Sequence, residues 1–508
     1  MSTLSKSKYT LSCQCLKALW LRCNKPEEAV VDAALEARFA AGSQIGKMAR
    51  SLFGDYTDTT AYTNDGQLDI SAMIRTTQQL MQSGCDVICE AAFSTPNHYC
   101  AVDILRKTAH GWAIYEVKSS TSHMIVKDPD KTFGKYAADI AYQRWVLEQC
   151  GVNVTETYLV TVNSDYVYMG QLDIQQFFNI TPMDAIASNE YLKVPNQVTM
   201  ALQTMGDSQE PEMDLSANCN KPYKCAFWKK YCTKHLPTPS VFNLYGVGCN
   251  FNQQLKLYKQ GIISYEALAQ QSLGPIQTLQ VNSWLNQQEY INQAGIMTFL
   301  NKVSYPLYFL DFESMQPAVP IYPNSKPYMQ ICFQYSLHYI EQEGGELKHK
   351  AFLAKSNGQD PRRELAESLC DDIPRDACIM AYNDPFEKTR IKEMASIFPD
   401  LEDHLMNIHD HIIDLLIPFR EGNYYRPDMG GSFSIKVVLP SLFPNDPELD
   451  YHHLSELVQN GGDAMTIFPK MKDMHPDEEQ KARQALLEYC KLDTYAMVKI
   501  WRKMLEVT

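Results

Sequence analysis

Tyr305-Pro306-Leu307-Tyr308-Phe309-Leu310-Asp311-Phe312-Glu313 decides the fold of the C-terminal part of this chain. The apolar run predicts a buried strand, and two acids close it. Side chains alternate along a strand, so Asp311 and Glu313 lie on the same face. Two carboxylates side by side repel each other unless a cation lies between them. The stretch therefore predicts a divalent-metal site of the kind that activates water.

Two further motifs complete a pattern with this strand. Met380-Ala381-Tyr382-Asn383-Asp384-Pro385-Phe386-Glu387 places an acid near the start of an expected helix. Farther on, Tyr489-x3-Asp493 places a tyrosine and an acid one turn apart on another helix. This order of motifs resembles the tyrosine-type DEDD exonucleases of the DnaQ-like group. The resemblance implies an RNase H-like fold, a five-stranded mixed sheet flanked by helices. The chain departs from that group in carrying Glu387 where an Asp is usual.

The resemblance also implies roles for these residues. Mg²⁺ or Mn²⁺ would be held by four acids, Asp311, Glu313, Glu387 and Asp493, and would clamp the attacking water and the leaving 3′ oxygen. Tyr489 would orient the water. Between these motifs, Ser434 and Lys436 open an apolar helix, where they could hold a phosphate, although a plain helix cap explains them equally well. Asp410 and Asp414 are possible neighbours of the metal site but are expected to be structural.

A separate acid set precedes this half of the chain. Three strand-like segments carry Glu90, Asp103 and the pair Glu116-x-Lys118. This order resembles the hairpin of a PD-(D/E)XK nuclease, and the resemblance implies that the acids hold a divalent metal and that the lysine orients the nucleophile. A surface hairpin with solvated charges is the alternative. Gln143, on an expected helix over residues 138–145, falls where RecB-type nucleases carry a glutamine that contacts the site.

Cysteines cluster at the end of this first region. Cys219, Cys225 and Cys232 lie within 14 residues, with aromatic residues between them. Such thiols are typical ligands of a soft metal or a cluster. A fourth ligand is needed, and Cys15 is preferred over Cys13 and Cys23. A zinc site or three buried thiols are the alternatives, although zinc usually takes closer Cys pairs.

One early cysteine and three late ones around a PD-(D/E)XK core resemble the iron–sulfur RecB-like nucleases, such as the AddB nuclease domain. There a 4Fe–4S cluster staples the two ends of the domain, and the resemblance favours that cluster over zinc here. The chain departs from many of these nucleases at Gly46, which stands where a metal-binding His is usual. Glu90 substitutes for it, or the site is weak.

Length and composition agree with a folded protein of several domains. The 508 residues are 45% hydrophobic and 21% charged, which is ordinary for a soluble globular chain. The sequence has no run of about 18 apolar residues that would predict a membrane span. Its first residues lack the apolar core of a signal peptide. We therefore expect a cytoplasmic protein with no membrane partner. A net charge of −14 argues mildly against a nucleic-acid partner, but local grooves matter more than the total.

The organisation expected from these patterns is a mixed α/β chain in three parts. Residues 1–235 form the iron–sulfur RecB-like nuclease domain, residues 241–300 a helical bridge, and residues 303–508 the DnaQ-like 3′–5′ exonuclease domain. The strands of the last part are expected at 303–312, 328–340 and 348–354, and its helices at 360–373, 384–397 and 478–506. As a whole, the chain resembles a bacterial family that fuses these two nuclease types.

The function expected from this resemblance is a bifunctional metal-dependent nuclease. Its substrate is nucleic acid, with DNA favoured over RNA, in DNA repair or in defence against foreign DNA. No phosphate loop is present, so any helicase would be a separate protein. One alternative is a 3′–5′ exonuclease whose first domain is a degenerate iron–sulfur module that binds nucleic acid. Another is a non-catalytic iron–sulfur scaffold or redox adaptor.

Overall fold

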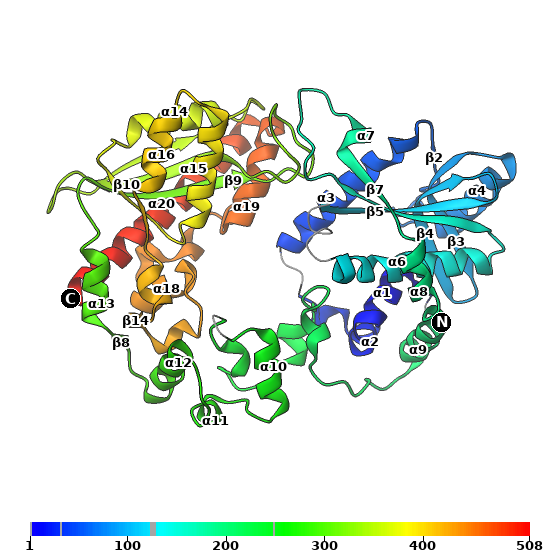
Figure 1. The fold of residues 1–508 in the computed structure, drawn as a ribbon, viewed down its shortest axis with the longest axis horizontal. Helices are drawn as coiled ribbons and strands as arrows, with labels where there is room; N and C mark the ends of the chain where they lie inside the picture. Colours follow the sequence, from blue (N-terminus) through cyan, green and yellow to red (C-terminus); the bar gives the residue numbers. More distant parts are fainter. Residues whose placement is uncertain (1–2, 31–32, 122–128, 247–248) are drawn as a thin grey trace. The chain divides into compact units, whose positions relative to one another are not determined.

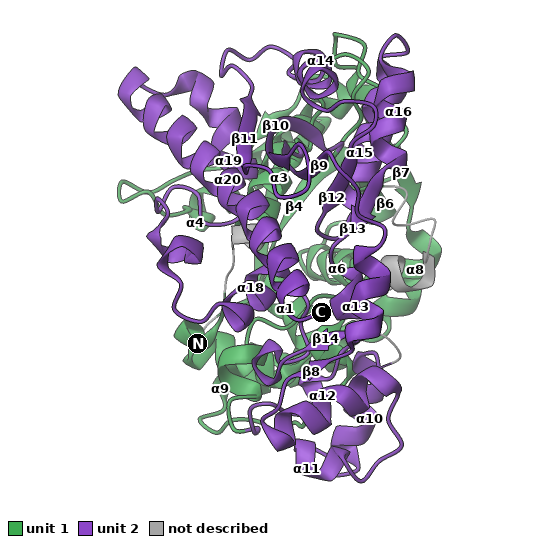
Figure 2. Ribbon diagram, turned by 90° about the vertical axis from the view of Figure 1, so that its left-hand side faces the viewer, with its two compact units in different colours: residues 1–235, 317–328 green, residues 236–316, 329–508 purple. Residues whose placement is uncertain are grey.

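The computed structural model describes residues 3–30, 33–121, 129–246 and 249–508 (Figure 1). The chain divides into two compact units (Figure 2). Unit 1 comprises residues 1–235 and 317–328, and unit 2 comprises residues 236–316 and 329–508. Residues 241–300 lie within unit 2. Both units contain sheets and helices, which confirms the mixed α/β class.

Unit 1 is built on a seven-stranded sheet of order β2-β3-β4-β5-β6-β7, in which β1 pairs with β4. Its strands are β1 (Leu4–Ser5), β2 (Thr57–Asp58), β3 (Val87–Thr95), β4 (His98–Lys107), β5 (Trp112–Thr121), β6 (Val154–Val162) and β7 (Phe178–Pro182). Its helices are α1 (Lys6–Gln14), α2 (Leu16–Asn24), α3 (Ala33–Ala49), α4 (Ile70–Ser83), α6 (Pro129–Gln149), α7 (Ile174–Phe177), α8 (Asp184–Tyr191) and α9 (Val194–Gly206). The antiparallel run β3-β4-β5 contains the expected hairpin.

The two faces of this sheet are buried against different elements. Alternation along β5 sends Ala113, Tyr115 and Val117 into a core shared with α3 and the 317–328 loop. Ile114 points to the opposite face, where it packs with α1, α6 and α9. Glu116 and Lys118 continue that second face toward α6. The apolar part of the strand thus decides which helix the charged pair meets.

The hairpin opens where its acids lie. The β4–β5 ladder pairs Ile104 with Tyr115 and goes no further toward Asp103 and Glu116. Beyond this point β1 takes the free side of β4 and pairs in parallel with His98 and Tyr99. Asp103 Oδ2 accepts a hydrogen bond from the Val117 amide at 2.7 Å, which satisfies a donor that the ladder leaves unpaired. The opening lets a side chain from the start of α1 enter between the two strands.

Unit 2 contains a five-stranded mixed sheet of order β11-β10-β9-β12-β13 and a two-stranded ribbon of β8 and β14. The strands are β8 (Tyr290–Ile291), β9 (Leu307–Met315), β10 (Ile331–Ile340), β11 (Lys348–Leu353), β12 (Cys378–Ala381), β13 (Ile412–Asp414) and β14 (Tyr424–Tyr425). The helices before the large sheet are α10 (Phe251–Lys259), α11 (Tyr265–Leu268), α12 (Pro275–Asn286) and α13 (Gln293–Leu300). The later helices are α14 (Arg362–Asp372), α15 (Pro385–Ile397), α16 (Glu402–Asp410), α17 (Ile417–Arg420), α18 (Ile435–Leu442), α19 (Gly461–Ile467) and α20 (Pro476–Glu506).

Strand β9 is central in this sheet and differs slightly from the expected 303–312. It begins after Pro306, which has no amide hydrogen to offer a ladder, and it continues to Met315. Asp311 and Glu313 therefore lie inside the strand rather than at its end. Opposite them in β10 are Ser336 and Gln334.

Helices cover both faces of the large sheet (Figure 1). Tyr308, Leu310 and Phe312 pack against α14, α15 and α16. Leu307 and Phe309 point the other way, into a core with α13, α18 and α20. Alternation places Asp311 and Glu313 on this second face, toward α18 and α20. No helix in the described part of the chain is both long enough and apolar enough to cross a membrane.

Candidate functional site

The acids expected in the C-terminal part meet in one buried place, which we call the carboxylate pocket: Asp311, Glu313, Glu387 and Asp493. Strand β9 supplies the first two, α15 supplies Glu387, and α20 supplies Asp493. Glu313, Glu387 and Asp493 are 7%, 4% and 8% exposed. Ligand atoms of Asp311, Glu313 and Cys490 lie within 4.8 Å of one another. The structure therefore brings together acids from three elements, and the first and last of these acids, Asp311 and Asp493, are 182 residues apart in sequence.

Burial and mutual repulsion make these carboxylates costly to ionise. Burial, and then the charge of Asp493, raises the pKa of Glu313 to about 8. Burial also raises the pKa of Glu387 to about 8 and that of Asp493 to about 6. The pKa of Asp311 lies well above its ordinary value for the same two reasons, burial and the charge of Asp493. A bound cation removes this cost.

The donor set fits a divalent cation. Glu387 Oε2 is buried and has no hydrogen-bond partner, which is expensive for a carboxylate oxygen that no ligand satisfies. Carboxylate oxygens are the ligands preferred by Mg²⁺ and Mn²⁺. The Cys490 thiol, 3.5 Å from Asp311 Oδ2, adds a softer neighbour. Cys490 follows Tyr489 directly, yet its position in the motif gave no reason to select it.

An open cavity of about 330 Å³ gives access to these acids. Asp311, Glu313 and Asp493 line it, together with Tyr489 and Lys436. The Lys436 ammonium lies 5.3 Å from the centre of the Tyr489 ring and 5.2 Å from that of Tyr451. Lys436 therefore presents a positive charge beside the acids, held by two aromatic faces. Ser434, its expected partner, is exposed and does not line the cavity.

Tyr451 is a member of this site that sequence reasoning missed. Its hydroxyl donates a hydrogen bond of 2.5 Å to Asp493 Oδ1. It lies in a short 3₁₀ turn, Tyr451–His453, 42 residues before its partner. No spacing or motif marks that turn, so only the tertiary structure could identify it.

The two neighbouring acids have different roles, neither of them in the pocket. Asp414 Oδ1 accepts hydrogen bonds from the amides of Asn383 and Leu416 at 2.8 and 2.9 Å. These bonds hold the turn before α15, in which Asn383 has a φ of 68°, and so they fix the helix that carries Glu387. Asp410 is exposed and pairs with His409.

The first acid set also comes together, in what we call the hairpin site: Asp103, Glu116, Lys118, Asp139 and Gln143. The Lys118 ammonium contacts Glu116 and lies 2.8 Å from Asp139 Oδ2. Gln143 Nε2 donates to Glu116 Oε2 at 2.7 Å and to Asp139 Oδ1 at 3.1 Å. The helix α6 thus brings its glutamine to the strand pair, and Asp139 joins as a third carboxylate.

A lysine that sequence reasoning did not select lies at the centre of the hairpin site. Lys6 Nζ is 3.1 Å from both carboxylate oxygens of Glu116 and 3.7 Å from Asp103 Oδ1. Burial alone would raise the pKa of Glu116, but the ammoniums of Lys118 and Lys6 hold it below its ordinary value. Burial and the charge of Glu116 raise the pKa of Asp103 to about 7.

Glu90 lies beside this site in a strained conformation. The β3–β4 register places it opposite Asp103, and its φ of 54° is unusual for a non-glycine residue in a strand. Its carboxylate pairs with Arg50 at 3.0 Å. A side chain at Gly46, the place of the usual His, would meet nothing within 4 Å of its Cβ. A metal-binding side chain would therefore fit at this position, but glycine has no side chain to bind a metal.

The four expected cysteines gather at one end of unit 1, and we call them the cysteine set: Cys15, Cys219, Cys225 and Cys232. Burial raises the pKa of Cys232 to about 11, and the charges of the other three thiols add to it. The sulfur atoms of Cys15 and Cys219 accept backbone N–H bonds of 3.4 Å from Ala18 and Ser216. Within the described residues, no three sulfur atoms of the set lie within 4.8 Å of one another.

Other contacts tie the two ends of unit 1 together around the cysteine set. Gln14 Nε2 donates to the carbonyls of Asn218 and Tyr223, each at 2.8 Å. Lys17 pairs with Glu210 at 2.7 Å. These contacts join the start of the chain to the loop that carries the last three cysteines.

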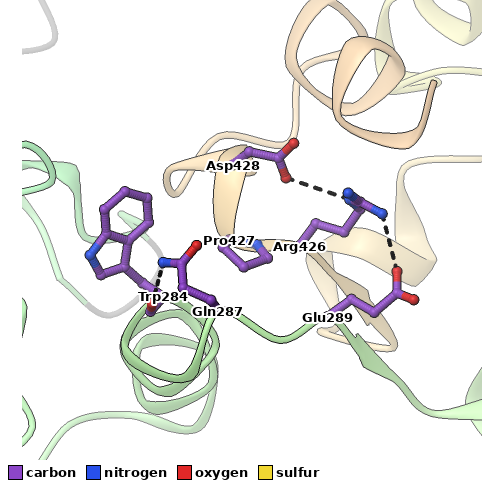
Figure 3. A pocket seen from close by; sticks show the side chains of 6 residues that line it. All are labelled: Trp284, Gln287, Glu289, Arg426, Pro427 and Asp428. Carbon is purple, nitrogen blue, oxygen red and sulfur yellow. Dashed lines mark hydrogen bonds and ion pairs between the residues drawn. The ribbon is translucent and has the colours of Figure 1, made fainter. Parts of the chain in front are cut away.

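A second cavity, of about 460 Å³, lies elsewhere in unit 2 (Figure 3). Its lining residues are Trp284, Gln287, Glu289, Arg426, Pro427 and Asp428. Arg426 lies between Glu289 and Asp428, at 3.3 and 3.5 Å, so two carboxylates already neutralise its charge. None of the residues selected from the sequence lines this cavity.

Comparisons with known proteins place the chain near others of undefined role. Residues 308–434 match a family described as a domain of unknown function, DUF2779. An uncharacterised protein of Ureaplasma parvum, UU173, is 28% identical over 241 residues, 43% of this chain and 34% of that protein. The uncharacterised protein MG366 of Mycoplasma genitalium is 22% identical over 388 residues, 68% of this chain and 56% of that protein. The chain spans about a third to just over half of the length of these relatives.

The stretch matched by the family contains only part of the carboxylate pocket. It runs from β9 to the residue before α18. It therefore includes Asp311, Glu313 and Glu387 but ends before Lys436 and Asp493. The descriptions of these relatives state no chemistry.

The carboxylate pocket makes the stability of the chain depend on pH and metal. Because the pKa of Glu313 is raised from 4.5 to about 8 in the folded state, the folded chain retains a proton that the unfolded chain releases. Without metal, the free energy of unfolding of the wild type should fall, relative to Glu313→Gln, by roughly 3 to 4 kcal/mol as the pH rises from about 5 to about 8. Thermal unfolding in EDTA at several pH values measures this difference.

Added Mn²⁺ provides the control for this measurement. A cation between the carboxylates replaces the retained protons, so Mn²⁺ should raise the melting temperature of the wild type more at pH 8 than at pH 6. In Glu313→Gln the Mn²⁺ effect should shrink. A metal-free difference that grows in favour of the wild type between pH 5 and pH 8 would contradict this account of the pocket.

Proposed function

We propose that this chain is a metal-dependent nuclease whose principal active site is the carboxylate pocket. The observation that carries the proposal is the convergence of Asp311, Glu313 and Asp493, at high energetic cost, on an open cavity that Tyr489 and Lys436 also line, with the charge of Glu387 acting on Asp311. A protein tolerates such repulsion when a cation offsets it, and perturbed acids in a cleft are typical of active sites. The proposed reaction is the hydrolysis of phosphodiester bonds from 3′ ends.

The strand order supports an RNase H-like arrangement for unit 2. Strand β9 is central, β10 and β11 continue antiparallel on one side, and β12 and β13 continue parallel on the other. The acids lie on β9, on the helix after β12 and on the last helix, which is the order of elements that the DnaQ-like resemblance implies.

Each residue of the pocket has a task in this proposal. Asp311, Glu313, Glu387 and Asp493 would hold Mg²⁺ or Mn²⁺, which activates water and neutralises charge on the phosphate. Tyr489 lines the cavity, and its hydroxyl would orient the attacking water. Lys436 offers a positive charge to the phosphate of the substrate. Tyr451 keeps Asp493 in place through its hydrogen bond.

We propose that unit 1 is a RecB-like nuclease domain with an iron–sulfur cluster. The hairpin site has the acid, acid and lysine of that type, with Gln143 on the adjacent helix. The resemblance favours a 4Fe–4S cluster over zinc, and the N–H bonds to Cys15 and Cys219 suit charged thiolates.

A basic surface beside the cysteine set supports a nucleic-acid partner. From Leu215 to His235 the chain has no Asp or Glu. Five exposed lysines lie in this stretch: Lys221, Lys224, Lys229, Lys230 and Lys234. Tyr223, between two of them, is 53% exposed. Lysines bind phosphates, and an exposed ring can stack on a base, which is how single strands are held without sequence preference. We favour DNA over RNA on the resemblance alone.

A second candidate function is supported by the cations that already pair with the acids at and beside the hairpin site. Lys6 lies between its acids, and Arg50 pairs with Glu90. In this alternative, unit 1 binds nucleic acid without cutting it, and the chain is a 3′–5′ exonuclease only. A non-catalytic iron–sulfur scaffold is the third candidate, and the cost of the carboxylate pocket speaks against it.

Nuclease assays with Mn²⁺ on end-labelled single- and double-stranded DNA and RNA test the proposal. Wild type, Asp103→Ala and Asp311→Ala are purified without air and compared. If each substitution removes a different product pattern, both units cut. If Asp103→Ala changes nothing and Asp311→Ala abolishes cleavage, unit 1 is a binding module. If the cluster-loaded wild type shows no metal-dependent cleavage, the non-catalytic scaffold is the remaining candidate.

A further inference from the structure

The hairpin site contains its own cation. Lys6 Nζ lies 3.1 Å from both oxygens of Glu116 and 3.7 Å from Asp103 Oδ1. These are the two carboxylates that would have to share a divalent metal. Lys118 holds the outer side of the same cluster, where it contacts Glu116 and Asp139. Three carboxylates thus meet two ammoniums, and little negative charge is left to attract a third cation.

The backbone around Lys6 is held in place by contacts on both sides of the residue. The residues before it form β1, which pairs with β4, the strand that carries Asp103. Leu4 is fully buried, and its carbonyl accepts a 2.6 Å hydrogen bond from the Tyr142 hydroxyl. Tyr9, one turn further along α1, stacks on the Tyr142 ring at 4.4 Å. Contacts on both sides of Lys6 therefore direct it into the opening between β4 and β5.

The position of the lysine is also consistent with a cation that can move. Glu116 is fully buried, but Lys6 is 24% and Asp103 25% exposed at the side chain. Solvent and metal ions can therefore reach the site. The lysine stem has four rotatable bonds, which allow the ammonium to swing toward solvent while the backbone stays in place.

We propose that Lys6 sets the metal requirement of the hairpin site, because its ammonium competes with a divalent cation for Asp103 and Glu116. The proposal rests on unit 1 having the nuclease-type metal site proposed above. When Mn²⁺ or Mg²⁺ binds, Lys6 leaves the two carboxylates, and its charge becomes available to a phosphate of the substrate. The hairpin site therefore binds metal weakly until the lysine is displaced.

Direct Mn²⁺ binding tests this competition without relying on activity. The full chain is purified without air in a background of Asp311→Asn and Asp493→Asn, which removes two of the four acids of the carboxylate pocket and weakens metal binding there. Free Mn²⁺ is followed by electron paramagnetic resonance during titration. Lys6→Met should bind Mn²⁺ at least tenfold more tightly than the parent. Lys6→Gln, which keeps a polar end without a charge, should do the same, and provides a second variant if Lys6→Met does not fold.

Two controls assign the gain to the hairpin site. Lys8→Met removes the same charge from the same helix at a lysine whose ammonium contacts the Thr3 carbonyl, and it should leave the Mn²⁺ affinity unchanged. Adding Asp103→Asn to Lys6→Met should abolish the gain. Unchanged or weaker Mn²⁺ binding in both Lys6 variants overturns the proposal. Absence of nuclease activity with intact tight Mn²⁺ binding would instead count against the proposed function alone.

Discussion

Asp311→Asn is expected to lower the rate of Mn²⁺-dependent 3′-end cleavage by at least about 10³-fold, the largest effect of any single substitution in the chain. Asp311 lies at the centre of the carboxylate pocket, where the charges of Asp493, Glu313 and Glu387 all act on it. Asparagine has nearly the same shape but supplies neither a negative charge nor a second ligand oxygen. Initial rates on 5′-labelled single-stranded DNA, with excess Mn²⁺, measure the loss.

The fold should survive this substitution, which makes the result interpretable. Removing one of several buried, mutually repelling carboxylates relieves repulsion, so the melting temperature in EDTA should stay equal or rise. Asp410→Asn is the matched control. It makes the same chemical change at an exposed residue that pairs with His409. It should retain full activity. Residual activity of Asp311→Asn within tenfold of the wild type would show that the pocket is not the active site.

Cys219→Ser is expected to have the second largest effect, the loss of the bound cluster and of stability in unit 1. The cysteine set and its neighbours join the start of the chain to the 219–232 loop. Metal or cluster binding by residues distant in sequence contributes directly to folding, so the loss should cost about 3 kcal/mol or more. Iron and sulfide content, the visible absorbance of the purified protein and its thermal unfolding measure the effect.

A matched cysteine substitution separates this role from a general effect of losing a thiol. Cys150 is exposed and lies outside the cysteine set, so Cys150→Ser should keep wild-type iron content and stability. If the wild type instead contains one zinc and no iron, the cysteine set binds zinc rather than an iron–sulfur cluster. If Cys219→Ser keeps the metal content of the wild type, the cysteine set is not a ligand set.

Much of the local structure was predictable because its signals are local. The apolar run before Asp311 predicts a strand, and β9 covers residues 307–315. The helix expected at 478–506 corresponds to α20 at Pro476–Glu506. Helix α15, expected at 384–397, begins one residue later. Hydrophobic periodicity and a proline at the first helical turn carry this information within a few residues of each element.

The face of each charged residue was also predictable. Alternation along β9 and β5 separates apolar positions from Asp311, Glu313, Glu116 and Lys118. Spacing of four on a helix brings Gln143 to Asp139, at 3.1 Å. Both inferences need only the geometry of one strand or one helix. The bridge expected at 241–300 was harder, because its grouping with unit 2 depends on contacts with distant residues.

The sequence by itself thus determined the strands and helices, the acids that they carry and the side of each element on which those acids lie. The tertiary structure alone decided which side chains complete the sites: Lys6 between Asp103 and Glu116, Tyr451 on Asp493, and Arg50 on Glu90. Lys6 and Tyr451 come from short elements without periodicity, a two-residue strand followed by a helix start and a 3₁₀ turn. A pattern reports on neighbours along the chain, whereas the charge balance of a buried site depends on every group that the fold brings within a few ångströms.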